Sequence, residues 1–372
     1  MTAARDRRSA QTPQAASSGG VNPTPMQLTI NGRFLTQGMT GVQRFAAEVT
    51  QAIARRCVPI RLLAPAGTPD RLGEVPVEHV GTRGGQAWEQ LDLPAVSNPA
   101  PLLSLGNTAP LRGGGKRYLV IHDAGVFDTP ESYSFAFRSW YRTLHLLLPR
   151  LGTQIITVSE FSRGRLAARL RMDPARIGVM PEGGEHVLRV AADDAVLAKH
   201  GLAPRGYALA VGTPAAHKNL GALGEAAGLL AARGMVLAVA GSVQGNAFSG
   251  AADAAGSGVK LLGRVTDGEL RALYENALCL VFPSRYEGFG IPPLEAMWCG
   301  CPVLAARAGA VPEVCGEAAL WFDAEGPATP AAALTRLIEE PGLADHLREA
   351  GRARAQLYSW DAAAARLLDL IR

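Results

Sequence analysis

Short apolar runs alternate along the chain with segments of helical periodicity, in two series separated near residues 184–205. Such uninterrupted apolar strands are typical of parallel sheets whose two faces are both covered by helices. The predicted strands are Gln27–Asn31, Ile60–Ala64, Leu102–Leu105, Tyr118–His122, Ile155–Ser159 and Ile177–Met180, then Tyr207–Val211, Val236–Ala240, Lys260–Leu262, Leu278–Pro283 and Pro302–Ala305. The pattern predicts an α/β protein of two Rossmann-like, doubly wound parallel-sheet domains that face each other across a cleft.

Helical spacing of apolar residues accompanies these strands. The predicted helices are Val42–Ile53, Phe161–Leu170, Leu220–Ala232 and Gly268–Ala277. Thr266 and Glu269 have the spacing of a capping box, which predicts where the last of these helices begins.

The same pattern sets the expected domain bounds. We expect an N-terminal domain over residues 26–190 and a C-terminal domain over residues 200–355. Residues 1–25 are rich in small and polar residues without periodicity, which predicts a disordered leader. Residues 356–372 are expected to form a helix that packs back on the N-terminal domain.

The amino-acid composition excludes several classes of protein. Of the 372 residues, 48% are hydrophobic and 19% charged, which excludes wholesale disorder. A net charge of +4 is too small to indicate a nucleic-acid partner. Five cysteines without a CxxC pair favour neither a disulfide framework nor structural zinc. We expect no export signal and no membrane span, and hence a cytoplasmic protein.

The most informative stretch is 282–297, FPSRYEGFGIPPLEAM, in which seven residues separate Glu287 from Glu295. Gly288 and Gly290 between them allow a backbone to approach a ligand closely. The two prolines that follow predict the first turn of a helix, whose N-terminus would favour a phosphate. Carboxylates accept hydrogen bonds from sugar hydroxyls, so the stretch fits a nucleotide sugar. The alternative is an ordinary strand–loop–helix turn whose acids face water.

This stretch, with Gly300-Cys301-Pro302-Val303 and Gly309-Ala310-Val311-Pro312-Glu313 after it, resembles the retaining glycosyltransferases of family four, which have the GT-B fold and a Glu-x7-Glu motif. The resemblance extends over most of the chain. Further matching segments are Asn31–Phe34, Thr40–Arg44, Trp88–Gln90, Ile121–Asp123, Val158–Ser162, and Gly212 with Lys218-Asn219.

The resemblance implies roles for the residues of the motif. Glu287 would bind the transferred sugar and Glu295 the ribose of the nucleotide. Gly288, Phe289 and Gly290 would offer backbone contacts to the sugar and the phosphates.

The resemblance also implies that the N-terminal domain, 26–190, holds the acceptor and the C-terminal domain, 200–355, the nucleotide sugar, with further contacts to the donor. Lys218 would contact the diphosphate, where a compact ammonium charge is suited; an ordinary surface lysine is the alternative. Gly41 would face the phosphates from the other domain, and Gly212 would begin the phosphate-binding segment. Arg264 and Val265 would recognise the base through their backbone.

His122 and Asp123 end a predicted strand, and the resemblance places His122 beside the anomeric carbon. The alternative is a histidine that only satisfies a neighbouring carbonyl. Asp123 would bind the acceptor or orient His122. Two positions depart from the family pattern: His217 stands where many relatives have Arg, and Glu182 stands where they have Asn.

The implied reaction moves a hexose, with retention, from a nucleotide diphosphate sugar to a glycan or a lipid-linked acceptor in polysaccharide biosynthesis. Mannose from GDP-mannose is the leading expectation and UDP-glucose the alternative. No Asp-x-Asp metal signature is present, so we expect neither a metal nor another cofactor.

Three different functions also suit a chain of two Rossmann-like domains. A nicotinamide oxidoreductase would need a G-x-G-x-x-G fingerprint, which the chain lacks. A sugar-binding protein without catalysis would usually be exported, and we expect no export signal. An inactive sugar-nucleotide-binding homologue would bind the donor without forming a product.

The pattern of apolar and basic side chains in residues 135–151 predicts a basic amphipathic helix that ends near Pro149. Its expected apolar face holds Phe137, Tyr141, Leu144 and Leu148, and its basic face Arg138, Arg142 and His145. A helix of this kind can lie on an anionic membrane, which would make the protein peripheral at the inner face of the plasma membrane. The alternative is a helix that packs into the domain core.

Overall fold

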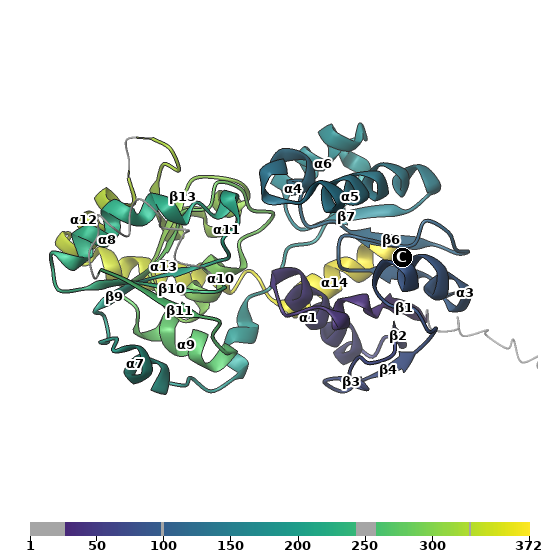
Figure 1. The fold of residues 1–372 in the computed structure, drawn as a ribbon, viewed down its shortest axis with the longest axis horizontal. Coiled ribbons are helices and arrows are strands. Elements are labelled where there is room, and N and C mark those ends of the chain that lie inside the picture. The colour runs from purple at the N-terminus through teal and green to yellow at the C-terminus, as the bar shows by residue number, and fades with distance from the viewer. Residues whose placement is uncertain (1–26, 98–99, 243–257, 327–328) are drawn as a thin grey trace, which may run out of the picture.

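The computed structural model describes residues 27–97, 100–242, 258–326 and 329–372. The chain forms two lobes that lie side by side, each built around one sheet (Figure 1). The predicted leader, residues 1–25, lies outside the described residues.

The sheet of the N-terminal lobe has eight strands in the order β3-β4-β2-β1-β5-β6-β7-β8. They are β1 (Leu28–Asn31), β2 (Ile60–Ala64), β3 (Arg71–Leu72), β4 (Val75–His79), β5 (Leu102–Ser104), β6 (Arg117–Val120), β7 (Gln154–Thr157) and β8 (Ile177–Val179). All neighbours pair in parallel except β3 and β4. In the centre Ile30 pairs with Leu62 on one side and with Leu103 on the other.

The sheet of the C-terminal lobe has six parallel strands in the order β11-β10-β9-β12-β13-β14. They are β9 (Tyr207–Val211), β10 (Val236–Ala240), β11 (Val259–Gly263), β12 (Cys279–Phe282), β13 (Val303–Ala306) and β14 (Ala319–Phe322). The strand order reverses between β1 and β5 in one lobe and between β9 and β12 in the other, as in doubly wound sheets. The predicted fold class is therefore confirmed. Ligand sites in such sheets lie outside the carboxyl ends of the strands at these reversals.

Helices connect the strands. They are α1 (Gly41–Arg55), α2 (Gly85–Ala87), α3 (Leu93–Val96), α4 (Gly125–Asp128), α5 (Phe135–Leu147), α6 (Glu160–Leu170), α7 (Ala195–His200), α8 (Gly224–Ala231), α9 (Asp267–Asn276), α10 (Ile291–Trp298), α11 (Val311–Cys315), α12 (Pro330–Glu339), α13 (Leu343–Ala355) and α14 (Trp360–Ile371). The capping box is confirmed, because Thr266 Oγ1 accepts the Glu269 N–H at 3.2 Å and the Glu269 carboxylate accepts the Thr266 N–H at 2.8 Å.

The last helix, α14, crosses from the C-terminal lobe to pack against α1 of the N-terminal lobe (Figure 1). The Tyr118 hydroxyl donates to the Ile371 carbonyl at 2.8 Å, and the Gln154 amide donates to the Leu370 carbonyl at 3.2 Å. The chain therefore passes between the lobes twice, once before and once after the C-terminal sheet.

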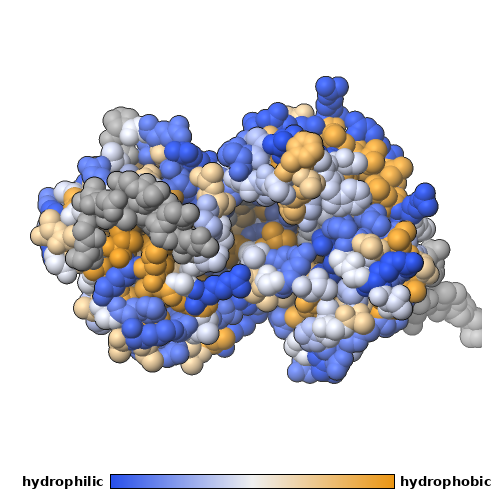
Figure 2. All heavy atoms as spheres, viewed as in Figure 1, coloured by the Kyte–Doolittle hydropathy of each residue, from blue (hydrophilic) through white to orange (hydrophobic). Residues whose placement is uncertain are grey.

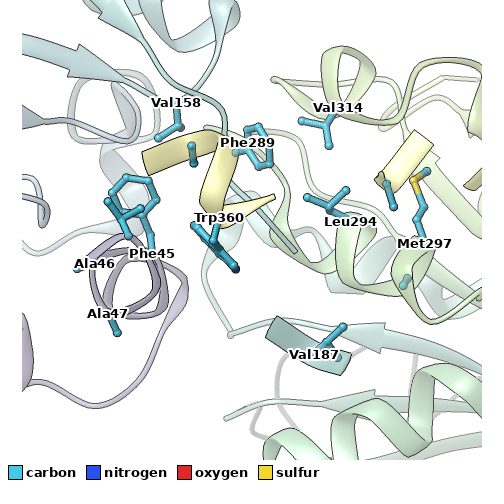
Figure 3. Packing of buried hydrophobic residues seen from close by; sticks show 14 of the residues in the cluster. Phe45, Ala46, Ala47, Val158, Val187, Phe289, Leu294, Met297, Val314 and Trp360 are labelled. Carbon is cyan, nitrogen blue, oxygen red and sulfur yellow. The ribbon is translucent and has the colours of Figure 1, made fainter. Parts of the chain in front are cut away.

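One hydrophobic core runs through both lobes. Phe45 of α1 and Trp360 of α14 are fully buried and pack with ring centroids 6.0 Å apart. Phe289 of the C-terminal lobe is buried in the same core, where the two lobes meet (Figure 3). Burial of these aromatic rings stabilises the contact between the two lobes.

Two further findings concern the described residues. None of their helices has both the length and the apolar character that a membrane crossing requires. All five cysteines lie in this part of the chain and are free thiols.

Candidate active site between the lobes

The loop after β12 rests directly on the N-terminal lobe. The Gly288 carbonyl accepts hydrogen bonds from Ser159 Oγ at 2.6 Å and Ser162 Oγ at 3.1 Å. A Cβ at Gly288 would clash with the His122 carbonyl oxygen, so only glycine fits at this position. This contact brings the predicted sugar-binding loop against the end of β6.

Other polar contacts hold the lobes together around this loop. The Glu313 carboxylate accepts the backbone N–H groups of Glu160 at 2.9 Å and Phe161 at 3.1 Å, in the first turn of α6. A carboxylate is stabilised at a helix N-terminus by the free N–H groups there. The Arg44 guanidinium of α1 donates to the Asp267 carboxylate of α9 at 2.6 Å.

Lys218 and Glu287 form an ion pair at the carboxyl ends of adjacent strands β9 and β12. Lys218 Nζ lies 2.7 Å from Glu287 Oε1, and their side chains are 19% and 12% exposed. Lys218 ends a short turn that follows β9, and Gly212 lies beside its side chain. The pair therefore stands at the reversal of strand order in the C-terminal sheet, where a nucleotide is expected.

His217 reaches across to the N-terminal lobe, where its Nδ1 lies 2.9 Å from Ser132 Oγ. Burial lowers the pKa of His217, and the positive charge of Lys218 lowers it further. His217 is therefore neutral at pH 7. Where an arginine would add a permanent charge, this chain keeps its positive charge on Lys218.

His122 is buried, and both of its ring nitrogens face acceptors. Nδ1 lies 2.9 Å from the Glu182 carboxylate, and Nε2 lies 3.1 Å from the Leu105 carbonyl oxygen. The ring also packs edge-on against Phe45, with centroids 4.5 Å apart. The predicted contact of His122 with the anomeric carbon would need a different ring orientation, because both nitrogens are engaged inside the lobe.

Asp123 faces the C-terminal lobe beside these groups. Its Oδ1 accepts the Gly125 N–H at 2.6 Å. Burial raises the pKa of the Asp123 carboxyl, and the negative charge of Glu287 raises it further, whereas the neighbouring His122 lowers it. Asp123, Glu287 and Lys218 thus form one electrostatically coupled group contributed by both lobes.

Glu295 lies apart from this group, within α10, and is buried. Its Oε1 lies 2.9 Å from His186 Nε2, and its Oε2 accepts the Tyr274 hydroxyl at 2.9 Å. Trp360 Nε1 donates to His186 Nδ1 at 3.0 Å, which leaves the proton of a neutral His186 on Nε2. The carboxylate predicted to hold the ribose is therefore the centre of a buried network that reaches α14.

The remaining residues of the motif take structural positions. Gly290 has φ of +116° and directly precedes α10, so Pro292 and Pro293 lie in its first turn as predicted. The Phe289 ring is buried and packs edge-on against Tyr358, with centroids 5.7 Å apart. Val265, which lies outside this motif, is partly buried and packs against the core that runs through both lobes.

A pocket of about 560 Å³ opens between the lobes, where the molecular surface is hollowed (Figure 2). Of the described residues that line this pocket, all belong to the N-terminal lobe except Arg264. Polar groups that line it include Gln37, Gln43, Asn107 and Asp123. Gly41 begins α1 nearby, and a Cβ there would lie 3.7 Å from Ile291 of α10.

An aromatic wall, formed by Tyr133, Phe137 and Tyr141, lines the other side of this pocket. The rings stack, with centroid separations of 5.5 Å between Tyr133 and Phe137 and 3.9 Å between Phe137 and Tyr141. The Tyr133 hydroxyl and Asp123 Oδ1 would both lie 2.7 Å from a Cβ at Gly125, so the wall ends at Asp123. The sequence placed two of these rings on one helix face but did not predict that the face lines the cleft.

The prediction of a basic face on α5 is wrong in two respects. His145 is buried, and its Nε2 lies 2.9 Å from the Asn107 carbonyl oxygen. The Arg142 guanidinium is turned inward and donates to the Val126 carbonyl at 2.6 Å. Helical spacing placed these side chains with Arg138, but it could not show that α4 and the loop after β5 cover that side of the helix.

No group of three or more His, Cys, Asp or Glu side chains in the described ranges is arranged to hold a metal ion. Of the predicted site residues, the structure brings together His122, Asp123, His217, Lys218, Glu287 and Gly288. The partners that spacing alone did not identify are Tyr133, His186, Tyr274 and Tyr286, whose hydroxyl accepts the Ala124 N–H beside Asp123 at 3.2 Å.

Comparisons with known proteins agree with this architecture. Residues 196–354 match the family model described as Glycosyl transferases group 1. The chain is 31% identical over 254 residues to O-antigen chain mannosyltransferase B of Escherichia coli, a match that covers 64% of this chain and 66% of that protein. It is 41% identical over 105 residues to the MMP alpha-(1->4)-mannosyltransferase of Mycolicibacterium hassiacum, covering 27% of this chain and 26% of that one.

The fold is shared with solved structures. Anabaena Alr3699/HepE, in complex with UDP and glucose, superposes with a TM-score of 0.73 at 16% identity, covering 93% of this chain and 99% of that one. At this identity the likeness concerns the fold. The family match over residues 196–354, the relatives and the two-lobed architecture together show a group 1 glycosyl transferase domain in a chain that has the GT-B fold.

Proposed function

We propose that this protein is a retaining hexosyltransferase that uses a nucleotide diphosphate sugar. The observation that carries the proposal is the Lys218–Glu287 pair, which stands at the strand reversal of the C-terminal sheet and faces Asp123 of the other lobe. An ammonium group suits a diphosphate, and a carboxylate suits the hydroxyls of the sugar attached to it. Both groups stand at the seam where a donor and an acceptor would meet.

Mannose from GDP-mannose is the proposed donor group, transferred to a glycan or a lipid-linked acceptor in polysaccharide biosynthesis. The names of the relatives support this choice, because both are mannosyltransferases and one is named for the O-antigen chain. UDP-glucose is the alternative donor.

In the proposed reaction, the bond between the anomeric carbon and the diphosphate oxygen breaks while the acceptor oxygen bonds from the same face. The proton of the acceptor hydroxyl passes to the departing phosphate. Lys218 stabilises the negative charge that develops on the leaving group, and Glu287 holds the sugar. Because a fixed cation and backbone N–H groups serve this purpose, we propose that transfer needs no metal.

The acceptor is proposed to bind in the pocket of about 560 Å³ on the N-terminal side. Amides and Asp123 can bind sugar hydroxyls, while the aromatic wall covers the apolar CH groups of a pyranose. Because the wall ends at Asp123, an acceptor lying along it would present its hydroxyl at the seam.

Contact with a membrane is proposed through the outer side of α5. There Phe135 is 76% exposed, with Arg138 over its ring, and Leu147 is 40% exposed; Leu151, in the turn that follows α5, is 49% exposed. This side replaces the Arg142 and His145 face expected from the sequence. We propose that the protein works in the cytoplasm, at the inner face of the plasma membrane. Flotation with anionic liposomes tests this: wild-type protein should float at low salt and Arg138→Glu should not, whereas wild-type protein that stays at the bottom contradicts it.

A donor screen tests the proposed function. Thermal shift and product analysis with GDP-mannose and UDP-glucose, each in the presence of EDTA, should show stabilisation and sugar release with GDP-mannose. Loss of activity in EDTA with recovery in magnesium would contradict the metal-free mechanism. Binding without any release or transfer would favour an inactive homologue.

A further inference from the structure

The side chain of Glu182 has no part in the transfer described so far, yet it is buried against a site residue. It follows β8 and points to His122 at the end of β6, with 2.9 Å between Glu182 Oε1 and His122 Nδ1. Both side chains are less than a tenth exposed. A buried carboxylate is costly unless it is paired and hydrogen-bonded.

The second ring nitrogen of His122 also faces an acceptor. Nε2 lies 3.1 Å from the Leu105 carbonyl oxygen, which can only accept a hydrogen bond. A neutral imidazole has one N–H, so it can satisfy only one of these two acceptors. The imidazolium form has two N–H groups and satisfies both.

The backbone of His122 is held as firmly as its ring. Its N–H donates to Asn107 Oδ1 at 2.8 Å, and its carbonyl accepts from Ser162 Oγ at 2.9 Å. The next residue, Asp123, is therefore fixed in place at the seam between the lobes.

We propose that Glu182 is a positioning residue that keeps His122 doubly protonated and turned away from the pocket, so that the imidazolium charge keeps the adjacent Asp123 ionised for a hydrogen bond from the acceptor hydroxyl. The other charged and titratable groups that act on this assembly are Glu287 and Tyr286 from the loop after β12, His217 from the turn after β9, and Tyr133 just before α5. Glu287 is itself neutralised by Lys218. The effect on transfer rests on the proposed function, whereas the charge state of His122 does not.

Burial is the largest influence on the pKa of His122 and lowers it, but the hydrogen bond and charge of Glu182, the Leu105 carbonyl and the charge of Asp123 together leave that pKa raised. Burial raises the pKa of the Glu182 carboxyl, whereas the hydrogen bond and the charge of His122 lower it. The positive charge of His122 lowers the pKa of Asp123 against the effect of burial. Glu182 therefore acts on Asp123 through His122.

The charge state of His122 is tested first, without any substrate. Long-range proton–nitrogen NMR of the wild-type protein at pH 7 separates imidazolium, with both nitrogens protonated, from the neutral tautomers. The chain has seven histidines, and the His122 signal is assigned by its loss in His122→Gln. We expect the imidazolium pattern in wild-type protein and in Glu182→Asp, and the neutral pattern in Glu182→Gln. A neutral His122 in wild-type protein would overturn the proposal, whatever the activity.

The effect on Asp123 is tested by the pH profile of transfer from GDP-mannose, or of its hydrolysis. In Glu182→Gln, the acid limb of kcat/KM should move to higher pH, because Asp123 loses the adjacent positive charge of His122; loss of the Glu182 charge, which also acts on Asp123, reduces the size of this shift. Glu182→Asp, which keeps a carboxylate beside His122, should return the acid limb most of the way to its wild-type position. Glu313→Gln, which disturbs the same seam at α6, serves as the control and should not move the acid limb. An unmoved acid limb in Glu182→Gln, with neutral His122 by NMR, would refute the link to Asp123.

Discussion

Lys218 Nζ and Glu287 Oε1 lie 2.7 Å apart, on turns that follow neighbouring strands of the C-terminal sheet. Each group neutralises the other while the site holds no ligand. A diphosphate that takes over Lys218 would leave the Glu287 carboxylate available for sugar hydroxyls. Binding of the leaving group and binding of the sugar are thereby coupled through one ion pair.

Substitutions of this pair should separate nucleotide binding from turnover. Lys218→Gln should weaken binding of GDP by roughly tenfold or more, because a charge-assisted contact to the diphosphate contributes about 1.5–3 kcal/mol. Glu287→Gln should abolish transfer but keep or improve GDP affinity, because a competing carboxylate is removed. Isothermal titration calorimetry measures both.

The matched control for this pair is Lys199→Gln, since Lys199 pairs with Glu269 at 2.9 Å on an exposed part of the same lobe. It should leave GDP affinity unchanged. Equal losses of GDP affinity in Lys218→Gln and Glu287→Gln would show that the two residues do not divide their roles in this way.

Glu295→Gln should reduce stability as well as nucleotide affinity. The carboxylate accepts from both His186 and Tyr274, and an amide cannot accept at both of its ends. Leaving a buried donor without an acceptor costs about 1–3 kcal/mol. Chemical denaturation should show this loss, and Tyr274→Phe, which removes a donor instead, should cost less. A Glu295→Gln variant of wild-type stability would contradict the buried network.

His145 should make the protein less stable on acidification. Burial lowers the pKa of His145 to about 4, against an ordinary value of 6.5. Between these pH values the unfolded chain binds a proton that the folded chain does not, so stability falls as pH falls, by at most about 1.4 kcal/mol per pH unit. Well above the ordinary pKa of histidine the effect is absent, because the imidazole is neutral in both states.

The measurement is the difference in unfolding free energy between wild type and His145→Gln, followed from neutral pH down to the lowered pKa of His145. Wild type should lose stability relative to the variant over this range. The control, exposed His346→Gln, should follow wild type at every pH. Parallel curves for wild type and His145→Gln would contradict a buried neutral histidine.

Phe137 should determine acceptor binding. Phe137→Ala removes the middle ring of the aromatic wall and should raise KM for a methyl mannoside or mannobiose acceptor severalfold, with little change in donor affinity. Phe135→Ala is the matched control, because this ring is on the same helix but outside the pocket. If both variants raise KM equally, or neither does, the acceptor binds elsewhere.

The sequence predicted the central strands because their residues are uninterrupted and apolar, as at Tyr207–Val211. It missed β3, β4 and β14, whereas it predicted β8 and β11 at the opposite edges of the two sheets. In β4, Pro76 and Glu78 interrupt the apolar pattern, and β3 has only two residues. A short strand at or beside a sheet edge needs few apolar residues, so periodicity detects it poorly.

The sequence predicted only part of the candidate site. Local spacing identified Glu287 and Glu295, because residues of one motif are close in sequence. It could not show that Glu295 pairs with His186, 109 residues away, or that His122 pairs with Glu182. Such partners are set by tertiary packing, and His145 was misplaced because the side of a helix that becomes buried depends on its neighbours.

The stereochemistry of transfer decides whether this protein is a metal-independent retaining transferase. Wild-type protein is incubated in EDTA with GDP-mannose labelled with ¹³C at C1 and a methyl mannoside acceptor, and the anomeric signals are followed by NMR from the earliest time points. We expect a new α-linked product, in which the anomeric configuration of the donor is retained. An initial β-linked product, or no product from either GDP-mannose or UDP-glucose, would be incompatible with the reaction proposed for the Lys218–Glu287 site.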